Sequence, residues 1–352
     1  MAPDAIRPDR DLIGRQRNPR RNRRADEALP EPADDKTDMH YAVLIQRLLS
    51  CDQNAKLSND APFPFHPEQD LVTLGDLFDP PYPMTAAWSQ PLTPTTNQFA
   101  SMDDTFAGFR RCLQKSVFWI NRIGDMIPGI QRREKVELLK NAFHGFALWQ
   151  ICVESYRLNM PNQVALCNNK SLSLPLNWNS CPRSPFAVPD DPKSSPPSTW
   201  GPMFEGVCWR MINEIIEPLH RVRPSEEEAA LVCAIIILEN PTFTLRPETR
   251  TVIEQLKDRL SCSLMYSIRR GGCEDVEDVQ RFSHILNLLP AVARVSCNLS
   301  DCLNLSRVFN QLQEPLLRRF YDILASGDNE NCLRLTDKDF ADVVATLCDK
   351  SL

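Results

Sequence analysis

The sequence predicts an all-α protein that carries one small β-hairpin. Apolar residues recur at three- and four-residue spacing over most of residues 106–308, which is the period of amphipathic helices. Strand-like runs occur around Asn168-Asn169, a pair that tolerates the positive φ angles of a tight turn. With 42% hydrophobic residues among 352, the chain can bury a substantial core in one large domain or two ordinary ones.

The first helices can be placed in order along the chain. Residues 39–53 predict an amphipathic helix, and a short helix is expected near residues 71–78 within a proline-rich loop at residues 61–98. The apolar stripe from Phe106 to Ile127 predicts a long helix that Pro128-Gly129 closes. The next helix, at residues 133–158, is apolar on nearly every face after Lys140 and is therefore expected to be buried and central.

A hairpin at residues 163–178 follows this central helix, and a second proline-rich loop covers residues 182–202. Ser225 with Glu228 forms a capping box, with acids in the first turn, that marks a helix start. The remaining helices are expected at residues 203–222, 225–238, 247–270 and 276–308.

The start of the chain differs in charge from the rest. Eight of the 40 basic and three of the 46 acidic side chains lie in residues 1–24, so this arm carries +5 and the remainder −11. We expect the arm to be disordered on its own, residues 25–38 to be a linker, and residues 326–352 to be a tail or an extra helix. The arm suits either DNA contact, through phosphates and the minor groove, or nuclear import. The arginines for either role are Arg15, Arg17, Arg20, Arg21, Arg23 and Arg24.

Several classes of function are disfavoured. Among 13 cysteines the closest pair is Cys297 and Cys302 and no C-x-x-C occurs, so we expect reduced thiols and neither a metal site nor a cofactor. No long apolar run or signal sequence is present, which disfavours membrane spanning and secretion. The histidines lie apart, and hydrolase, Walker and dinucleotide motifs are missing, so no enzyme is expected.

Segments in order along the chain resemble the ligand-binding domain of nuclear hormone receptors. Residues 121–150 resemble the family's signature, which spans the end of its third helix, a turn and its fourth-fifth helix. Three further stretches are similar to its eighth, ninth and tenth helices: RPSEEEAALVCAIIILENP (223–241), VIEQLKDRLSCSLMY (252–266) and RFSHILNLLPAVARVS (281–296). The resemblance covers residues 39–325 and implies a three-layer antiparallel helical sandwich.

The basic arm itself resembles the extension that follows the second zinc finger in this family. The zinc fingers are absent from this chain, so it would be a naturally short form or one that begins late. The resemblance implies zinc only in such a finger domain, and DNA contact through the arm in a longer form that carries it.

The resemblance implies a groove that binds a coregulator helix of the Leu-x-x-Leu-Leu type. A cation near the last carbonyls of that helix is favoured. Counting back from Leu138-Leu139 places Arg122 at the family's lysine position, with Lys140 at the second basic position. Alternatively, these are two solvated basic residues on a charged helix. The apolar floor would consist of Ile127, Ile130 and Val136.

The resemblance also implies an acid on a mobile terminal helix, within a pattern of two apolar residues, any residue, an acid and two apolar residues. RFYDIL (319–324) offers Asp322, and DFADVV (339–344) offers Asp342 as the alternative. Both segments use aspartate where glutamate is usual and begin with a charged residue. This departure weighs against ligand-dependent activation.

A ligand pocket is implied beneath the third and fifth helices, the hairpin and the tenth-eleventh helix. Relatives that bind acids have an arginine where this chain has Glu154, whose buried charge would repel a carboxylate, although Arg157 lies one turn on. The expected ligand is a neutral lipid or sterol, or else these residues only fill the core. The candidate pocket residues are Cys112, Leu113, Ser116, Val117, Phe146, Ala147, Gln150, Glu154, Leu166 and Cys302 or Leu305.

The implied function is that of a ligand-regulated or orphan transcription factor that recruits coactivators or corepressors in the nucleus, with the cytoplasm as a second compartment. The helix at residues 281–308 would serve a homodimer or a receptor heterodimer. One alternative is an interaction-only protein that sequesters partners by dimerisation without binding DNA. Another is a lipid-binding carrier.

Overall fold

The structure is a computed structural model. It describes residues 35–56, 73–78, 100–159, 162–168, 170–173, 202–239, 245–271 and 275–326. The basic arm, Asp342 and most of the two proline-rich loops lie outside these ranges, so the predictions for them are not addressed by the structure.

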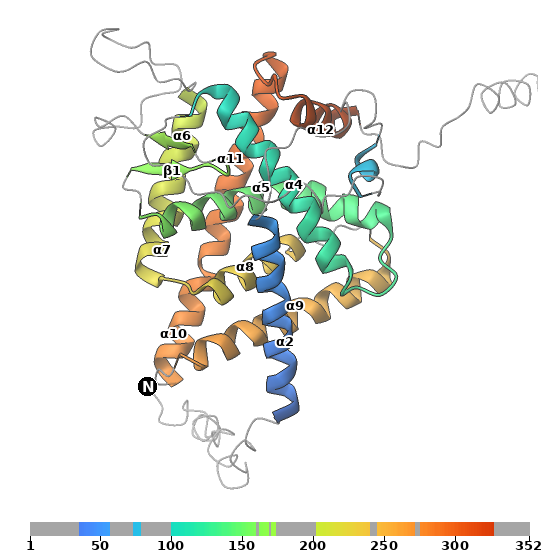
Figure 1. The fold of residues 1–352 in the computed structure, drawn as a ribbon, viewed down its shortest axis with the longest axis vertical. Helices are drawn as coiled ribbons and strands as arrows, with labels where there is room; N and C mark the ends of the chain where they lie inside the picture. The colour runs from blue at the N-terminus through green and yellow to red at the C-terminus, as the bar shows by residue number, and fades with distance from the viewer. Residues whose placement is uncertain are drawn as a thin grey trace, which may run out of the picture.

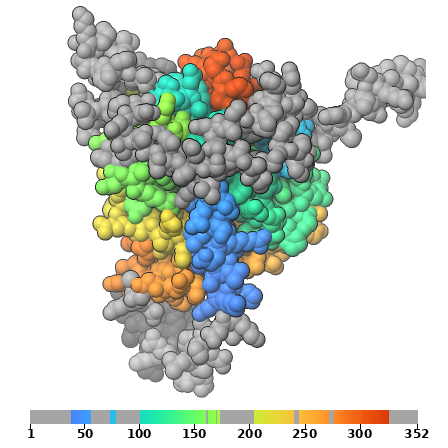
Figure 2. Space-filling view, in the orientation of Figure 1, coloured from blue at the N-terminus to red at the C-terminus, as the bar shows by residue number. Residues whose placement is uncertain are grey.

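The helices pack in three layers, as predicted (Figure 1). One outer layer holds α2 (Asp35–Lys56) and α4 (Met102–Gly124). The central layer holds α5 (Arg132–Arg157), α8 (Glu226–Leu238) and α9 (Pro247–Arg269). The other outer layer holds α6 (Pro202–Met211), α7 (Glu217–Val222), α10 (Asp275–Leu286) and α11 (Leu288–Val308). Figure 2 shows α2 on the surface of one face of the molecule. A short 3₁₀ helix, η2 (Leu74–Phe78), confirms the one expected in the first loop.

The central helix α5 is buried along most of its length, which confirms its predicted position. It contacts α4 on one side and α11 on the other, and lies beside α8 within its own layer. The Trp149 indole donates a 3.1 Å hydrogen bond to the Ala229 carbonyl, which joins α5 to α8. No helix in the described part of the chain is long and apolar enough to cross a membrane.

The predicted hairpin is present as a two-stranded antiparallel sheet. β1 (Gln163–Ala165) pairs with β2 (Ser171–Ser173), and Val164 lies opposite Leu172. The hairpin lies close to α4, since a Cβ added at Gly108 would come within 3.3 Å of the Leu166 Cβ. A glycine in α4 therefore allows the hairpin to pack tightly against the helix.

Two predicted helices have different ends in the structure. α4 ends at Gly124 rather than at Pro128-Gly129, because the N–H groups of Met126 and Ile127 bond to carbonyls three residues back instead of four. Residues 276–308 form α10 and α11, which are separated at Asn287. Pro290 has no N–H to donate to the Leu286 carbonyl, so the regular hydrogen bonding of one helix is interrupted.

The segment predicted as one helix at residues 203–222 contains a π turn, η4 (Ile212–Ile216), between α6 and α7. The Glu217 N–H bonds to the Ile212 carbonyl five residues back. Pro218 follows and has no N–H for the carbonyl four residues before it, so the wider turn occurs where a regular α-helical bond is missing.

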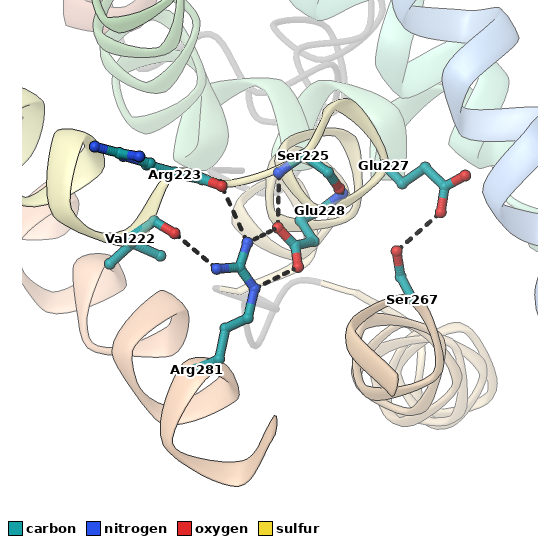
Figure 3. Close-up of polar contacts among 7 residues, drawn as sticks. All are labelled: Val222, Arg223, Ser225, Glu227, Glu228, Ser267 and Arg281. Carbon is teal, nitrogen blue, oxygen red and sulfur yellow. Dashed lines mark hydrogen bonds and ion pairs between the residues drawn. The ribbon is translucent and has the colours of Figure 1, made fainter. Parts of the chain in front are cut away.

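The predicted capping box begins α8 and is joined to α10 by an arginine (Figure 3). The Ser225 hydroxyl accepts from the Glu228 N–H at 3.1 Å, and Glu228 accepts from the Ser225 N–H at 2.7 Å. Arg281 of α10 binds both Glu228 carboxylate oxygens, at 3.0 and 2.7 Å. It also donates to the carbonyls of Val222 and Arg223, so one guanidinium joins α10 to the end of α7 and the start of α8.

Candidate functional site

Arg122, the predicted clamp residue, lies in the last turn of α4. Its side chain is 53% exposed and makes a long ion pair of 3.8 Å with Asp125. The guanidinium also lies 5.4 Å from the centre of the Phe118 ring. The Phe118 ring and the C-terminal end of α4 both favour the positive charge of this exposed guanidinium.

The turn between α4 and α5 carries the predicted groove floor and is held by Arg246, just before α9. The Arg246 guanidinium donates to the Gly129 carbonyl at 2.6 Å and to both Glu134 carboxylate oxygens, at 3.1 and 2.9 Å. Of the floor residues, Ile127 and Val136 are buried, whereas Ile130 is partly exposed. The surface available to a bound helix is therefore provided by Ile130 above two buried aliphatic side chains.

The second predicted basic residue, Lys140, lies on α5 and is engaged within its own helix. Its ammonium group makes a 2.9 Å ion pair with Glu137, and about a fifth of its side chain is exposed. A second lysine, Lys135, bonds to the Asn121 side chain at 2.9 Å and so joins the first turn of α5 to the last turn of α4. Any ligand contact by Lys140 must compete with Glu137.

The terminal helix α12 (Pro315–Ser326) is packed on α5 through two aromatic residues. The Phe320 ring meets the Phe143 ring edge-on at 5.2 Å. The Tyr321 hydroxyl lies 2.7 Å from His144 Nε2 in a buried hydrogen bond. Burial lowers the pKa of His144 to about 4, so near neutral pH the imidazole is uncharged in this hydrogen bond.

Asp322, the predicted acid of the terminal helix, is partly exposed and accepts a 3.1 Å hydrogen bond from Arg307 of α11. The buried residues of α12 also fit the expected pattern (two apolar residues, any residue, an acid and two apolar residues) when it is aligned three residues earlier in the chain. Leu316-Leu317 and Phe320-Tyr321 are buried pairs separated by two arginines, so in this register Arg319 occupies the position of the acid. The helix thus carries a carboxylate at Asp322 and a guanidinium at Arg319.

Most of the predicted pocket residues are buried in the hydrophobic core of the domain, to which all of its helical layers contribute. These residues are Cys112, Leu113, Val117, Phe146, Ala147, Leu166 and Cys302. Ser116 is also buried, and its hydroxyl donates to the Leu113 carbonyl at 2.7 Å. Leu305, in contrast, is 40% exposed, so Cys302 is the interior residue at this end of α11.

The two polar pocket candidates on α5 have partners. Gln150 donates to the Cys233 sulfur at 3.4 Å. Glu154 makes a 3.7 Å ion pair with Arg157, the residue that was expected to compensate its charge. Glu154 was expected to be buried, but a third of its side chain is exposed, so it would repel a carboxylate ligand less than predicted.

A polar cluster that the sequence did not predict lies inside this core. Arg111 and Lys115 are buried cations on α4, and both approach Cys167 in the hairpin. Their four-residue spacing within an apolar stripe was the available indication, because residues four apart share one face of a helix. The residue that they approach lies more than 50 positions further along the chain, which the spacing does not reveal.

The three helical layers, the hairpin after a buried central helix and the packed terminal helix define a protein class. The model of the ligand-binding domain of nuclear hormone receptor matches residues 93–309, more than half of the chain. The chain belongs to the nuclear hormone receptor family.

Particular relatives are Caenorhabditis elegans proteins. The chain is 25% identical to nuclear hormone receptor family member nhr-61 over 220 residues, which cover 62% of this chain and 49% of that protein. It is 22% identical to member nhr-31 over an aligned length of 361 residues, or 97% of this chain and 55% of that protein. For member nhr-3 the identity is 23% over 341 residues, or 88% and 71%. The chain thus spans about half the length of the first two relatives.

Proposed function

We propose that this nuclear hormone receptor regulates transcription in the nucleus by binding coregulator helices at the surface between α4 and α5. The observation that carries the proposal is the exposed Arg122 beside a turn fixed by Arg246. The last carbonyls of a bound helix are unpaired, so an exposed guanidinium is a suitable partner for them.

The existing contacts of Arg122 leave its guanidinium available to the carbonyl oxygens of a bound helix. Its ion pair with Asp125 is long and exposed on both sides, so it contributes less than about 1 kcal/mol. A helix that presents carbonyl oxygens can displace Asp125 at little cost. Leucines of the bound helix would then cover Ile130, the exposed part of the apolar floor.

The opposite end of the bound helix has two candidate contacts on α12. Asp322 would accept from its first, unpaired N–H groups, if that carboxylate leaves Arg307. In the other register Arg319 lies at this position and favours a helix with acidic residues at its N-terminal end. Comparison of variants at the two residues separates these arrangements.

Ligand regulation, dimerisation and DNA contact belong to the same proposal. A neutral lipid or sterol is the proposed ligand class, because this chain has Glu154 where relatives that bind acids have an arginine. For a homodimer or receptor heterodimer, α10 carries the exposed apolar residues Val276 and Val279. DNA contact would use the basic arm in a form of the protein that carries zinc fingers.

The experiment is anisotropy of a fluorescent Leu-x-x-Leu-Leu peptide titrated with the full chain. We expect Arg122→Ala to weaken binding by about tenfold, the effect of losing a charge at a helix end in a partly covered site. Arg269→Ala is the matched control, because Arg269 is exposed in the last turn of α9, and it should leave the affinity unchanged.

Further variants test the other contacts of the peptide. Lys140→Ala should weaken binding less than Arg122→Ala, because Lys140 is engaged by Glu137. If Asp322 binds the peptide's amides, Asp322→Asn weakens binding and Arg319→Glu does not. An unchanged affinity of Arg122→Ala, or an equal loss with Arg269→Ala, would contradict the proposal.

A further inference from the structure

Two thiols from distant parts of the chain meet inside the protein. Cys112 lies on α4 and Cys167 follows β1 in the hairpin, and their sulfur atoms are 3.3 Å apart. Cys112 is fully buried and Cys167 is 8% exposed. The hairpin is held at this position, because the Ser155 hydroxyl of α5 accepts a 2.8 Å bond from the Ala165 N–H.

The surroundings of the pair distinguish the two sulfurs. The Lys115 ammonium lies 3.9 Å from the Cys167 sulfur, and the Arg111 guanidinium donates to the Cys167 carbonyl at 2.8 Å. The bond from Cys112 and these cations lower the pKa of Cys167 to about 6, although burial and Glu154 oppose this shift. The same hydrogen bond and burial raise the pKa of Cys112. Of the two sulfurs, Cys167 is therefore the one that ionises more readily.

The charge of Lys115 is retained despite its burial. Burial alone would lower the pKa of its ammonium group, but Cys167, Cys112 and more distant carboxylates raise it above its ordinary value. A buried cation beside a thiolate is the environment that makes a cysteine nucleophilic. Cys297 on α11, in contrast, is exposed at the surface.

We propose that Cys112 and Cys167 form a reversible oxidation site for hydrogen peroxide that joins α4 covalently to the hairpin. In the first step the Cys167 thiolate attacks one peroxide oxygen, so an S–O bond forms, the O–O bond breaks, and hydroxide leaves and takes up a proton to become water. In the second step the Cys112 sulfur attacks the resulting sulfenic acid. The S–S bond forms, the S–O bond breaks, and the leaving hydroxide takes the Cys112 proton as a second water.

The required movement is small. The sulfur atoms must approach from 3.3 Å to about 2.05 Å, a change within the range of side-chain rotation when the hairpin shifts slightly. The bond would fix the hairpin on the face of α4 that carries the buried cluster with Leu113 and Val117. Oxidation would therefore restrict access to the interior of the domain between these elements.

The test is a peroxide pulse on the reduced full chain, followed by denaturing alkylation and peptide mapping without reduction. We expect a cross-linked peptide that contains Cys112 and Cys167 to form before Cys297 is oxidised. At pH 7 a thiol with a pKa of about 6 is roughly nine-tenths ionised against a few per cent for an ordinary thiol. Allowing for the lower nucleophilicity of acidic thiols, the expected advantage is roughly two- to threefold in rate.

Variants assign the order of the two steps. In Cys112→Ser, dimedone should capture a sulfenic acid at Cys167, whereas Cys167→Ser should leave Cys112 unmodified. Lys115→Met should slow cross-linking several-fold, because the neighbouring positive charge is lost. Lys257→Met on α9, far from the thiols in sequence and exposed in part, is the matched control and should not slow it.

The pH dependence of the cross-linking rate in the wild type tests the proposal even if a variant with a buried substitution fails to fold. The cross-linking rate should rise with pH around pH 6 and level off by about pH 7.5, since the Cys167 thiolate is the reacting species. A rate that keeps rising through pH 8.5 would overturn the assignment of the nucleophile. Oxidation of Cys297 with both interior thiols still reduced, or a cross-link to another cysteine, would overturn the site itself.

Discussion

The substitution Glu134→Gln tests how the turn between α4 and α5 is held. Glu134 is 1% exposed, accepts from the Gln131 N–H at 2.8 Å and binds the Arg246 guanidinium through both carboxylate oxygens. Glutamine keeps the size of the side chain but removes its charge. The substitution therefore weakens the contact that holds Arg246 against the Gly129 carbonyl and the groove floor.

The expected loss can be worked out from the ionisation of Glu134. Burial alone would raise the pKa of this carboxyl, but the hydrogen bonds from Arg246 and from the Gln131 N–H lower it to about 2. A shift of about 2.5 units below the ordinary value corresponds to roughly 3 kcal/mol. Because Arg246 is one-third exposed and remains solvated in the variant, we expect a loss of about 2–3 kcal/mol at pH 7.

The sign of the pH dependence follows from the same shift. A carboxyl whose pKa is lower in the folded state stabilises the protein above its unfolded pKa of about 4.5, and this contribution is lost as the pH falls towards 2. The difference between wild type and Glu134→Gln should therefore be full at pH 7 and shrink below pH 4.5.

Urea unfolding followed by circular dichroism at pH 7 and at pH 3 measures both values. Glu254→Gln on the exposed face of α9 is the control and should change stability by less than about 0.5 kcal/mol. A loss for Glu134→Gln no larger than that of the control would refute the reasoning. A difference that stays the same from pH 7 to pH 3 would refute the ionisation argument in particular.

Three further substitutions test other contacts. His144 has a pKa lowered to about 4 by burial, so its contribution is present above its ordinary pKa of about 6.5 and lost as the pH falls towards 4. Urea unfolding at pH 7 and pH 5 should show wild type losing on the order of 1–2 kcal/mol more than His144→Gln, and equal losses would contradict this. Glu228→Gln should destabilise by about 2–3 kcal/mol in the same assay, because Arg281 loses its charged partner; a change below about 0.5 kcal/mol would contradict it. Gly108→Val should cost about 1–3 kcal/mol by crowding Leu166, and an unchanged midpoint in urea would show that the hairpin can move away.

The elements were predictable because each depends on local sequence. Helical spacing, the Ser225 capping box and the two strand-like runs of the hairpin act within a few positions of the chain, and the structure confirms the helices, the capping box and the paired strands. The misplaced ends have causes that apolar spacing does not report. After Gly124 the N–H groups of Met126 and Ile127 bond three residues back, and Pro290 has no N–H for the Leu286 carbonyl.

The contacts of the candidate site were less predictable for the same reason. Arg122 could be placed from its spacing to Leu138-Leu139, and its exposure at the end of α4 agrees with that placement. The partner that fixes the adjacent turn, Arg246, is 112 residues from Glu134 in sequence. His144 and Tyr321 are 177 residues apart, so only the folded chain shows that α12 packs on α5.

The central claim is that coregulator helices bind between the end of α4 and the start of α5. It is tested most directly by a Leu-x-x-Leu-Leu peptide in which a photoreactive diazirine replaces the first leucine side chain. After irradiation with the full chain, peptide mapping locates the attachment. We predict attachment within residues 122–140 or on α12, with loss of the product in Arg122→Ala. Attachment confined to α10 and α11, or a yield that Arg122→Ala does not change, would contradict the account.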